Sequence, residues 1–228
     1  MRPEGRDAGR IPSSFRDPAG FLFVRDGTLF RHVARTGAAG YDLLLASGLY
    51  ERLAGEGLLV RHDEVPAPEG HEEAHRVLRP AEVPVVTYPY EWTFGQLQDA
   101  ALLTLRVQRR ALERGLWLKD ASAFNVQLAD GRPVLIDTLS FEAYPEGRPW
   151  VAYRQFCQHF LAPLALMSRV DLRLGRLLGA HLDGVPLDLA SALLPLRTRL
   201  QPGLLLNLHL HAWSHAPLSG RAPARMWR

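Results

Sequence analysis

The sequence predicts an α+β protein with two lobes, a small β-rich N-terminal lobe and a helical C-terminal lobe. Three observations predict this division. Short apolar runs with turn signals come first, a long amphipathic helix follows, and proline-punctuated helical segments fill the rest. We expect the N-terminal lobe to span residues 21–90 and the C-terminal lobe residues 91–215. Residues 1–20 are expected to form a flexible lead-in, and residues 216–228 a C-terminal tail.

Composition excludes several classes of protein. With 228 residues, 47% of them hydrophobic, the chain is long and apolar enough to bury a sizeable core. Cys157 is the only cysteine, so a disulfide-built secreted scaffold is excluded. The net charge of +3 comes without a block of basic residues, so we expect no nucleic-acid partner. Residues 1–20 contain no apolar signal region, and the apolar stretch 156–167 is too short to span a bilayer. We therefore expect a cytoplasmic protein without a membrane partner.

The first elements are expected to be strands and a helix. Apolar runs at 21–24 and 28–33 flank Asp26-Gly27, a dipeptide typical of a two-residue hairpin turn. Apolar residues then recur at helical spacing over 41–53, and glycines follow the last of them, which predicts a helix and its end. The apolar run at 58–65 predicts another strand.

The middle of the chain predicts the connection between the lobes. A polar loop is expected at 66–76 and a strand at 83–90, with Tyr88–Trp92 as the hinge. Apolar positions then recur every three or four residues over 93–114, which predicts a long amphipathic helix ended by Gly115.

A second hairpin and a set of helices complete the prediction. Two short strands at 125–128 and 133–137 are joined by a turn that contains Asp130-Gly131. Prolines interrupt the apolar segments that follow. We expect those segments to be helices, one starting at Trp150, one at about 170–180 and one at about 188–200.

Candidate catalytic and metal-binding residues surround this second hairpin. Asp120 precedes Asn125 by five positions, and Asp137 ends the second strand. Antiparallel strands that start and finish at one edge bring Asn125 and Asp137 within reach of one cation. This order of aspartate, asparagine and strand-ending aspartate is typical of kinase-like phosphotransfer. We predict that Asn125 and Asp137 bind the magnesium of Mg-ATP and that Asp120 is the catalytic carboxylate for an acceptor hydroxyl.

Each of these residues also has a purely structural interpretation. Asp120 could cap a turn, Asn125 could fill a turn position, and Asp137 could cap a helix. Lys119, the only lysine in the chain, is a further catalytic candidate because a flexible point charge can meet a transferring phosphate. The alternative is that one lysine codon survives by chance in an arginine-rich chain.

The N-terminal half departs from the kinase pattern. It contains no G-x-G-x-x-G loop and no lysine in a V-A-I-K strand. Arg31 occupies the place of that lysine, and Glu51 on the following helix could pair with it, so we predict these two as cofactor-binding residues. The alternative is a solvated surface pair.

The segments LKDASAFNVQL, GRPVLIDTLSFE and PWVAYRQFCQHFLAPLALM resemble a known family. Its members are bacterial proteins described as SAM-dependent methyltransferases, some of them as nodulation-type proteins. The resemblance covers most of the chain and is densest between Val85 and Met167. It implies that this chain corresponds to a kinase-like N-terminal region that precedes a class I methyltransferase domain.

The resemblance and the residues lead to different functions. No strand in the sequence is followed by the glycine-rich turn of a SAM site, so we do not expect this chain alone to bind SAM. The first hypothesis is Mg-ATP-dependent phosphotransfer to a small-molecule or glycan hydroxyl. The second is a non-catalytic, pseudokinase-like module of a SAM-dependent methyltransferase, or one truncated from it. A methyltransferase domain or chain would then be its partner.

Overall fold

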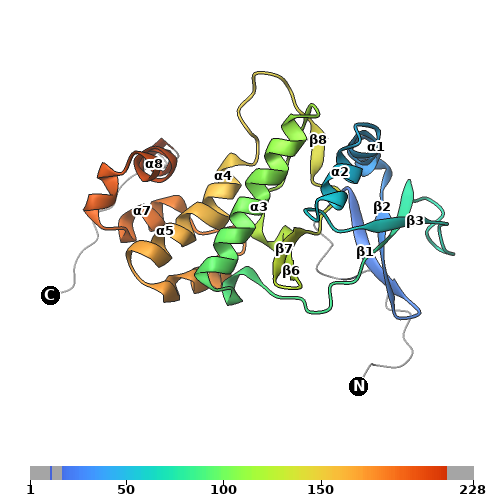
Figure 1. Ribbon diagram of the computed structural model, residues 1–228, viewed down its shortest axis with the longest axis horizontal. Coiled ribbons are helices and arrows are strands. Elements are labelled where there is room, and N and C mark those ends of the chain that lie inside the picture. The colour runs from blue at the N-terminus through green and yellow to red at the C-terminus, as the bar shows by residue number, and fades with distance from the viewer. Residues whose placement is uncertain (1–10, 12–16, 215–228) are drawn as a thin grey trace.

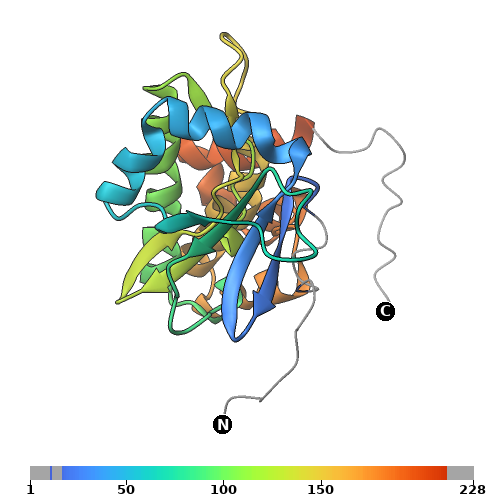
Figure 2. The same cartoon turned by 90° about the vertical axis from the view of Figure 1, so that its right-hand side faces the viewer.

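The computed structural model describes residue 11 and residues 17–214 and shows a mixed α+β protein. A small antiparallel sheet occupies one end of the molecule, and most of the helices lie at the other end (Figure 1). Figure 2 looks onto the sheet, with the helical part behind it. Most of the expected lead-in and the whole tail at 216–228 lie outside the described residues.

Four strands form the sheet in the order β1-β2-β4-β3, and each neighbouring pair is antiparallel. The β1–β2 turn confirms the predicted hairpin, because Asp26 and Gly27 have φ angles of 49° and 73°. Both residues lie in the left-handed region that a tight two-residue hairpin turn requires. The strands are β1 (Gly20–Arg25), β2 (Thr28–Val33), β3 (His62–Val65) and β4 (Arg76–Pro80).

The predicted strand at 83–90 is wrong, and the fourth strand is Arg76–Pro80 instead. Val77 and Leu78 of this strand are each 1% exposed, whereas Val85 is 64% exposed. Prolines at both ends of the 83–90 segment remove backbone donors that a strand would need. Apolar content alone therefore predicted the wrong segment as a strand. The segment that pairs in the sheet is the one whose apolar side chains are buried.

The first predicted helix is two helices, α1 (Ala38–Ala46) and α2 (Leu49–Gly55). Gly48 lies between them with a φ angle of 69°, a conformation that ends α1. The long amphipathic helix is confirmed as α3 (Phe94–Leu112). Thr93 caps its N-terminus in a reciprocal arrangement with Gln96.

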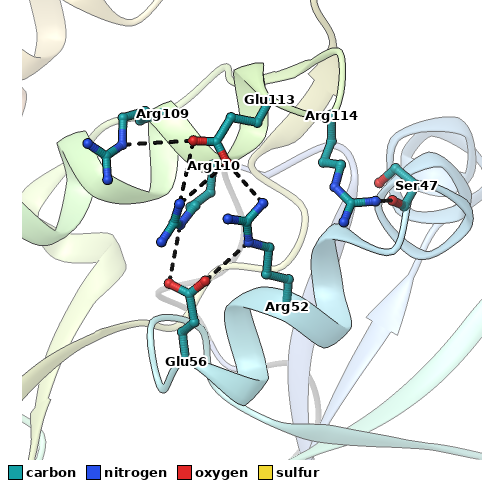
Figure 3. Close-up of polar contacts among 7 residues, drawn as sticks. All are labelled: Ser47, Arg52, Glu56, Arg109, Arg110, Glu113 and Arg114. Atoms are coloured by element: carbon teal, nitrogen blue, oxygen red, sulfur yellow. Dashed lines mark hydrogen bonds and ion pairs between the residues drawn. The ribbon is translucent and has the colours of Figure 1, made fainter.

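Ion pairs join α2 to α3 on the surface (Figure 3). Arg52 and Glu56 of α2 face Arg110 of α3 and Glu113 at its end. Arg52 pairs with both glutamates at 2.9–3.1 Å, and Arg110 pairs with the same two at 3.2–3.4 Å. We call these residues, together with Arg109, the surface network; it fixes one helix of the N-terminal half against the long helix.

The second hairpin is confirmed and lies beside α3. It consists of β6 (Val126–Ala129) and β7 (Arg132–Leu135), with Asp130 and Gly131 both at positive φ in the turn. A further strand pair flanks it, formed by β5 (Leu116–Leu118) and β8 (Phe141–Ala143). Residues 136–140 therefore run between two strands whose positions are both fixed.

The C-terminal part is helical, as predicted, but is built from short segments that prolines separate. Among the described residues no helix is both long and apolar enough to cross a membrane. The α-helices are α4 (Tyr153–Phe156), α5 (Ala162–Arg169), α6 (Leu177–Ala180), α7 (Leu187–Leu193), α8 (Pro202–Leu204) and α9 (His211–Ser214), with π-helical turns at Cys157–Leu161 and Leu205–Leu210 and 3-10 turns at Leu172–Arg176 and Leu196–Leu200.

Two hydrophobic clusters hold these elements together. The larger cluster contains buried residues of α2, α3, the second hairpin and the C-terminal helices. The smaller one lies against the sheet and contains Ala19, Val33, Tyr41, Leu78 and Leu139. Leu139 follows the second hairpin directly, so its burial at 3% exposure holds the segment after β7 against the sheet.

Candidate functional site

Asn125 and Asp137 lie close together at the open end of the second hairpin. The Ile136 amide donates a hydrogen bond to the Asn125 carbonyl at 2.8 Å. The Asn125 side-chain amide donates to the Ser140 hydroxyl at 3.4 Å, and that hydroxyl donates to Asp137 Oδ2. One serine therefore links the two predicted magnesium ligands, which are as close as the hairpin geometry required.

Arg31 of β2 reaches the same carboxylate from the sheet. Its Nη2 atom lies 2.7 Å from Asp137 Oδ1 and 2.9 Å from Asp17 Oδ2. Arg31 and Val33 share a strand face, and Val33 belongs to the buried cluster with Leu139. Packing of that cluster thus positions Arg31 opposite the segment that carries Asp137. The Arg31 and Asp137 side chains are only 14% and 16% exposed.

The electrostatic environment keeps Asp137 ionised. Burial on its own raises the pKa of the Asp137 carboxyl. Arg31, the Ser140 hydroxyl and the Leu139 amide lower it, and Lys119 adds a smaller effect in the same direction, so the pKa lies below its usual value. Asp137 is therefore a carboxylate at neutral pH, with its charge balanced by the Arg31 guanidinium.

Asp120 and Lys119 belong to the loop that leads into the hairpin. Asp120 Oδ1 accepts a hydrogen bond from the Ser122 amide at 2.8 Å, which fits the predicted structural alternative of a turn-capping aspartate. The Lys119 amide donates to the Ser140 carbonyl at 2.8 Å, while its side chain is exposed. Gln155 of α4 holds the loop by accepting from the Ala121 amide at 2.7 Å.

The ion pair between Arg31 and Glu51 is not among those of the described part of the chain. Arg31 pairs with Asp17 and Asp137, and Glu51 is exposed on α2. The reason is the direction of the Arg31 side chain, which faces the segment after β7. Arg31 lies on a strand, as predicted, but its ion-pair partners are Asp17 and Asp137 and not Glu51.

Two residues that contact Arg31 or Asp137 were not predicted from the sequence. Asp17 fell in the expected flexible lead-in, and Ser140 follows the motif by three positions. Ser140 is 0% exposed and contacts both Asn125 and Asp137, so only the fold shows its position. No periodicity or spacing in the sequence signals either residue.

The donor set fits a hard cation such as magnesium in part. Carboxylate and amide oxygens are the ligands that magnesium prefers. Among the described residues, however, no group of three or more histidine, cysteine, aspartate or glutamate side chains is placed to hold a metal. Asp137 Oδ1 already pairs with Arg31 and accepts a hydrogen bond from the Leu139 amide, and Asp137 Oδ2 accepts one from the Ser140 hydroxyl. A cation could thus reach Asp137 only if Arg31 moves away from it.

Two buried polar atoms at this place lack an acceptor or donor. Within the described chain, Arg31 Nε and Thr138 Oγ1 are buried and have no hydrogen-bond partner. Buried donors without acceptors are costly, by about 1–3 kcal/mol each. An anionic ligand beside Arg31 would satisfy one of them, which supports the fit of a phosphate-bearing group at this position.

Comparison with known proteins gives limited additional information. No family model matches the chain. Nodulation protein NoeA of Rhizobium meliloti (strain 1021) is 37% identical over 182 residues, which are 78% of this chain and 38% of NoeA. The chain therefore spans less than half the length of this relative. A solved structure of vaccinia related kinase 3 is 12% identical over 60% of this chain and 47% of that one, with a TM-score of 0.36. A TM-score of that size does not establish a shared fold.

Proposed function

We propose that the chain is a kinase-like domain that binds Mg-ATP where Arg31 of the sheet meets Asp137 after the second hairpin. In this proposal it transfers a phosphoryl group to a hydroxyl of a small molecule or glycan. The observation that carries the proposal is the meeting of Arg31 with Asp137 at 2.7 Å. A basic residue on a sheet strand and an aspartate after the catalytic hairpin are the two groups that hold nucleotide phosphates and magnesium in protein kinases.

The roles of the residues follow from their chemistry. Arg31 would donate to phosphate oxygens, which a guanidinium can do with two parallel hydrogen bonds. Asp137 and the Asn125 amide oxygen would hold the cation, and Ser140 would keep the two side chains in register. Magnesium, when bound, would neutralise charge on the transferring group. Lys119, exposed beside Asp137, would face the phosphate from the solvent side.

Asp120 is proposed to orient the acceptor hydroxyl. Its Oδ1 accepts from the Ser122 amide, which fixes the side chain and leaves Oδ2 for an acceptor. A positioned carboxylate within hydrogen-bond reach can take a proton from a hydroxyl in the transition state. Glu51 remains a cofactor-binding prediction that would require α2 or its side chain to turn toward Arg31.

A second candidate function is a non-catalytic, pseudokinase-like module of a longer protein, with a methyltransferase domain or chain as its partner. Two observations favour it. Arg31 already neutralises Asp137, and the chain spans only 38% of the length of NoeA. In this case the Arg31–Asp137 pair would be a permanent structural element that fastens the hairpin to the sheet.

Thermal unfolding with nucleotide separates the two candidates. We expect ATP to raise the melting temperature only when Mg²⁺ is present, because Asp137 repels the phosphates unless a cation bridges them. A ligand that binds only the folded state stabilises it by about 2.7 kcal/mol at a hundredfold excess over its dissociation constant. Asp137→Asn should abolish the shift, and Asp120→Asn should preserve it.

Asp130→Asn is the matched control, because Asp130 is exposed in the turn of the same hairpin and asparagine tolerates its positive φ. It should behave like the wild-type protein. The absence of any shift at millimolar Mg-ATP would reject nucleotide binding and favour the non-catalytic module. Equal loss in the Asp120 and Asp137 variants would show that Asp120 is structural.

A further inference from the structure

Arg31 is held between two carboxylates by a single nitrogen atom. Nη2 contacts both Asp17 Oδ2 and Asp137 Oδ1. Asp17 is itself fixed, because its Oδ1 atom accepts from the Ala19 amide at 2.8 Å. Ala19 is buried and accepts a hydrogen bond from the Ala34 amide beyond β2. Asp17 is thus anchored to the sheet, whereas Asp137 belongs to the segment after the hairpin.

The second carboxylate changes what separation of Arg31 from Asp137 would cost. A buried guanidinium deprived of its only carboxylate is strongly unfavourable, as an uncompensated buried charge. With Asp17 in place, Arg31 keeps one ion pair after it leaves Asp137. The row of three charges carries one negative charge in excess, so replacing the Arg31 contact at Asp137 by a cation also improves the local balance of charge.

We propose that Asp17 is a positioning residue that retains Arg31 when Asp137 is released to a cation. Arg31 then remains in the site with donors available to an anionic group. The buried and unpartnered Nε atom, the one such guanidinium nitrogen among the described residues, is the donor that would gain an acceptor. This inference rests on the proposed function, since it assigns the means by which the same site opens.

The test uses Mn²⁺ as the probe, with binding measured by calorimetry on the full chain. Arg31→Gln removes the competing charge from Asp137, so Mn²⁺ alone should bind about tenfold more tightly, equivalent to 1.4 kcal/mol. The same variant should bind Mg-ATP more weakly, since the phosphate contact is lost. A merely structural defect should not strengthen the binding of Mn²⁺ while it weakens the binding of Mg-ATP.

Asp17→Asn tests the positioning residue directly. With only Asp137 left as a carboxylate partner, Arg31 should hold it more firmly, and Mn²⁺ binding should weaken by about tenfold. Asp17→Glu should restore binding in part, because a carboxylate is retained. The Asp17→Asn variant keeps the Arg31–Asp137 pair, so it tests the proposal even if Arg31→Gln does not fold.

The Asp63–Arg79 pair on β3 and β4 provides matched controls. It joins the same residue types at 2.8 Å but is more than half exposed. Asp63→Asn and Arg79→Gln should leave Mn²⁺ binding unchanged. Weaker binding in these controls too would overturn the proposal, because it would reflect a general loss of charge on the sheet.

The outcomes separate this inference from the proposed function. If the wild-type protein binds Mn²⁺ and Mg-ATP and the Asp17→Asn variant binds them equally well, the proposed role of Asp17 is wrong. The proposed function is then unaffected. If the Arg31→Gln variant binds Mn²⁺ and the wild-type protein does not, Asp137 is not released and phosphotransfer is rejected as well. The Arg31–Asp137 pair would then be a permanent structural contact. No binding by any variant also rejects both.

Discussion

Two ionic clusters join separate parts of this molecule, and they differ in burial and in arrangement. The surface network connects α2 to α3 through alternating arginines and glutamates, and its Glu113 side chain is 40% exposed (Figure 3). The cluster of Arg31, Asp17 and Asp137 connects the sheet to the segment after β7, and its arginine is 14% exposed. In the surface network every charge except that of Arg109 has two or more ion-pair partners, and the side chains are partly exposed.

The difference separates a structural contact from a candidate site. Exposed ion pairs contribute about 0.2–1 kcal/mol each, and salt weakens them. An arginine that has a buried, unpartnered Nε and two carboxylates on one nitrogen is a costly arrangement for stability alone. Such groups are more typical of a site that binds a charged ligand.

The largest effect is expected at Arg31, whose side chain is 14% exposed. Arg31→Gln should lower the free energy of unfolding by about 3 kcal/mol, because it leaves two carboxylates next to each other without a cation. Urea unfolding followed by circular dichroism measures the change. A loss below about 1 kcal/mol, the range of an exposed pair, would show that the two clusters are energetically alike.

Ser140→Ala should have the next largest effect. It removes the hydroxyl that donates to Asp137 and accepts from Asn125, and a hydrogen bond to a charged group contributes about 1.5–3 kcal/mol. Ser122→Ala is the matched control, since Ser122 Oγ accepts from the Phe124 amide in the same loop and does not contact Asp137. Equal losses of unfolding free energy in the two variants would argue against a linking role for Ser140.

The two clusters should respond differently to acid and salt. Burial raises the pKa of Glu56, but the neighbouring arginines lower it by more. The pKa of Glu56 therefore lies below its usual value, as does that of Asp137. A carboxyl whose pKa is lowered in the folded state stabilises the fold at pH values above its pKa in the unfolded chain, which is about 4. That stabilisation is lost as the pH falls through the pKa of the folded state. In 1 M NaCl the pKa of Glu56 should return toward normal while that of Asp137 stays low, as measured by carboxyl NMR. Equal responses to salt would mean that Asp137 is as solvated as Glu56.

The smallest effect is expected in the surface network. Arg52→Gln should lower the free energy of unfolding by less than about 1 kcal/mol, because each pair is partly exposed. The loss should disappear when the same urea titration is repeated in 1 M NaCl. A larger, salt-independent loss would indicate that the contact between α2 and α3 depends on this network.

Local signals in the sequence were sufficient for the hairpins and the long helix. Asp-Gly at 26–27 and 130–131 predicts tight turns because both residues must adopt positive φ, and both turns do. Thr93 and Gln96 similarly mark the start of α3. The strand at 76–80 was missed because its pairing depends on contacts distant in sequence, which burial rewards and local apolar content does not report.

The proximity of Asn125 and Asp137 was predictable to the same extent. The hairpin brings Asn125 and Asp137 together through backbone geometry, so their spacing in the sequence was enough. The partner of Arg31 was not predictable, because the packing of Leu139 under the sheet decides which carboxylate it meets. Asp17 joins the cluster through a tertiary contact with Arg31, and Ser140 through a local hydrogen bond to Asp137 and a longer-range one from Asn125.

The most direct test of the central claim is a crystal structure with Mn²⁺ and a non-hydrolysable ATP analogue. We predict an anomalous manganese peak coordinated by Asp137 and Asn125, with Arg31 still paired to Asp17 and donating to a phosphate oxygen. A structure that contains the nucleotide elsewhere, or that keeps Arg31 on Asp137 without a manganese peak, would contradict the account.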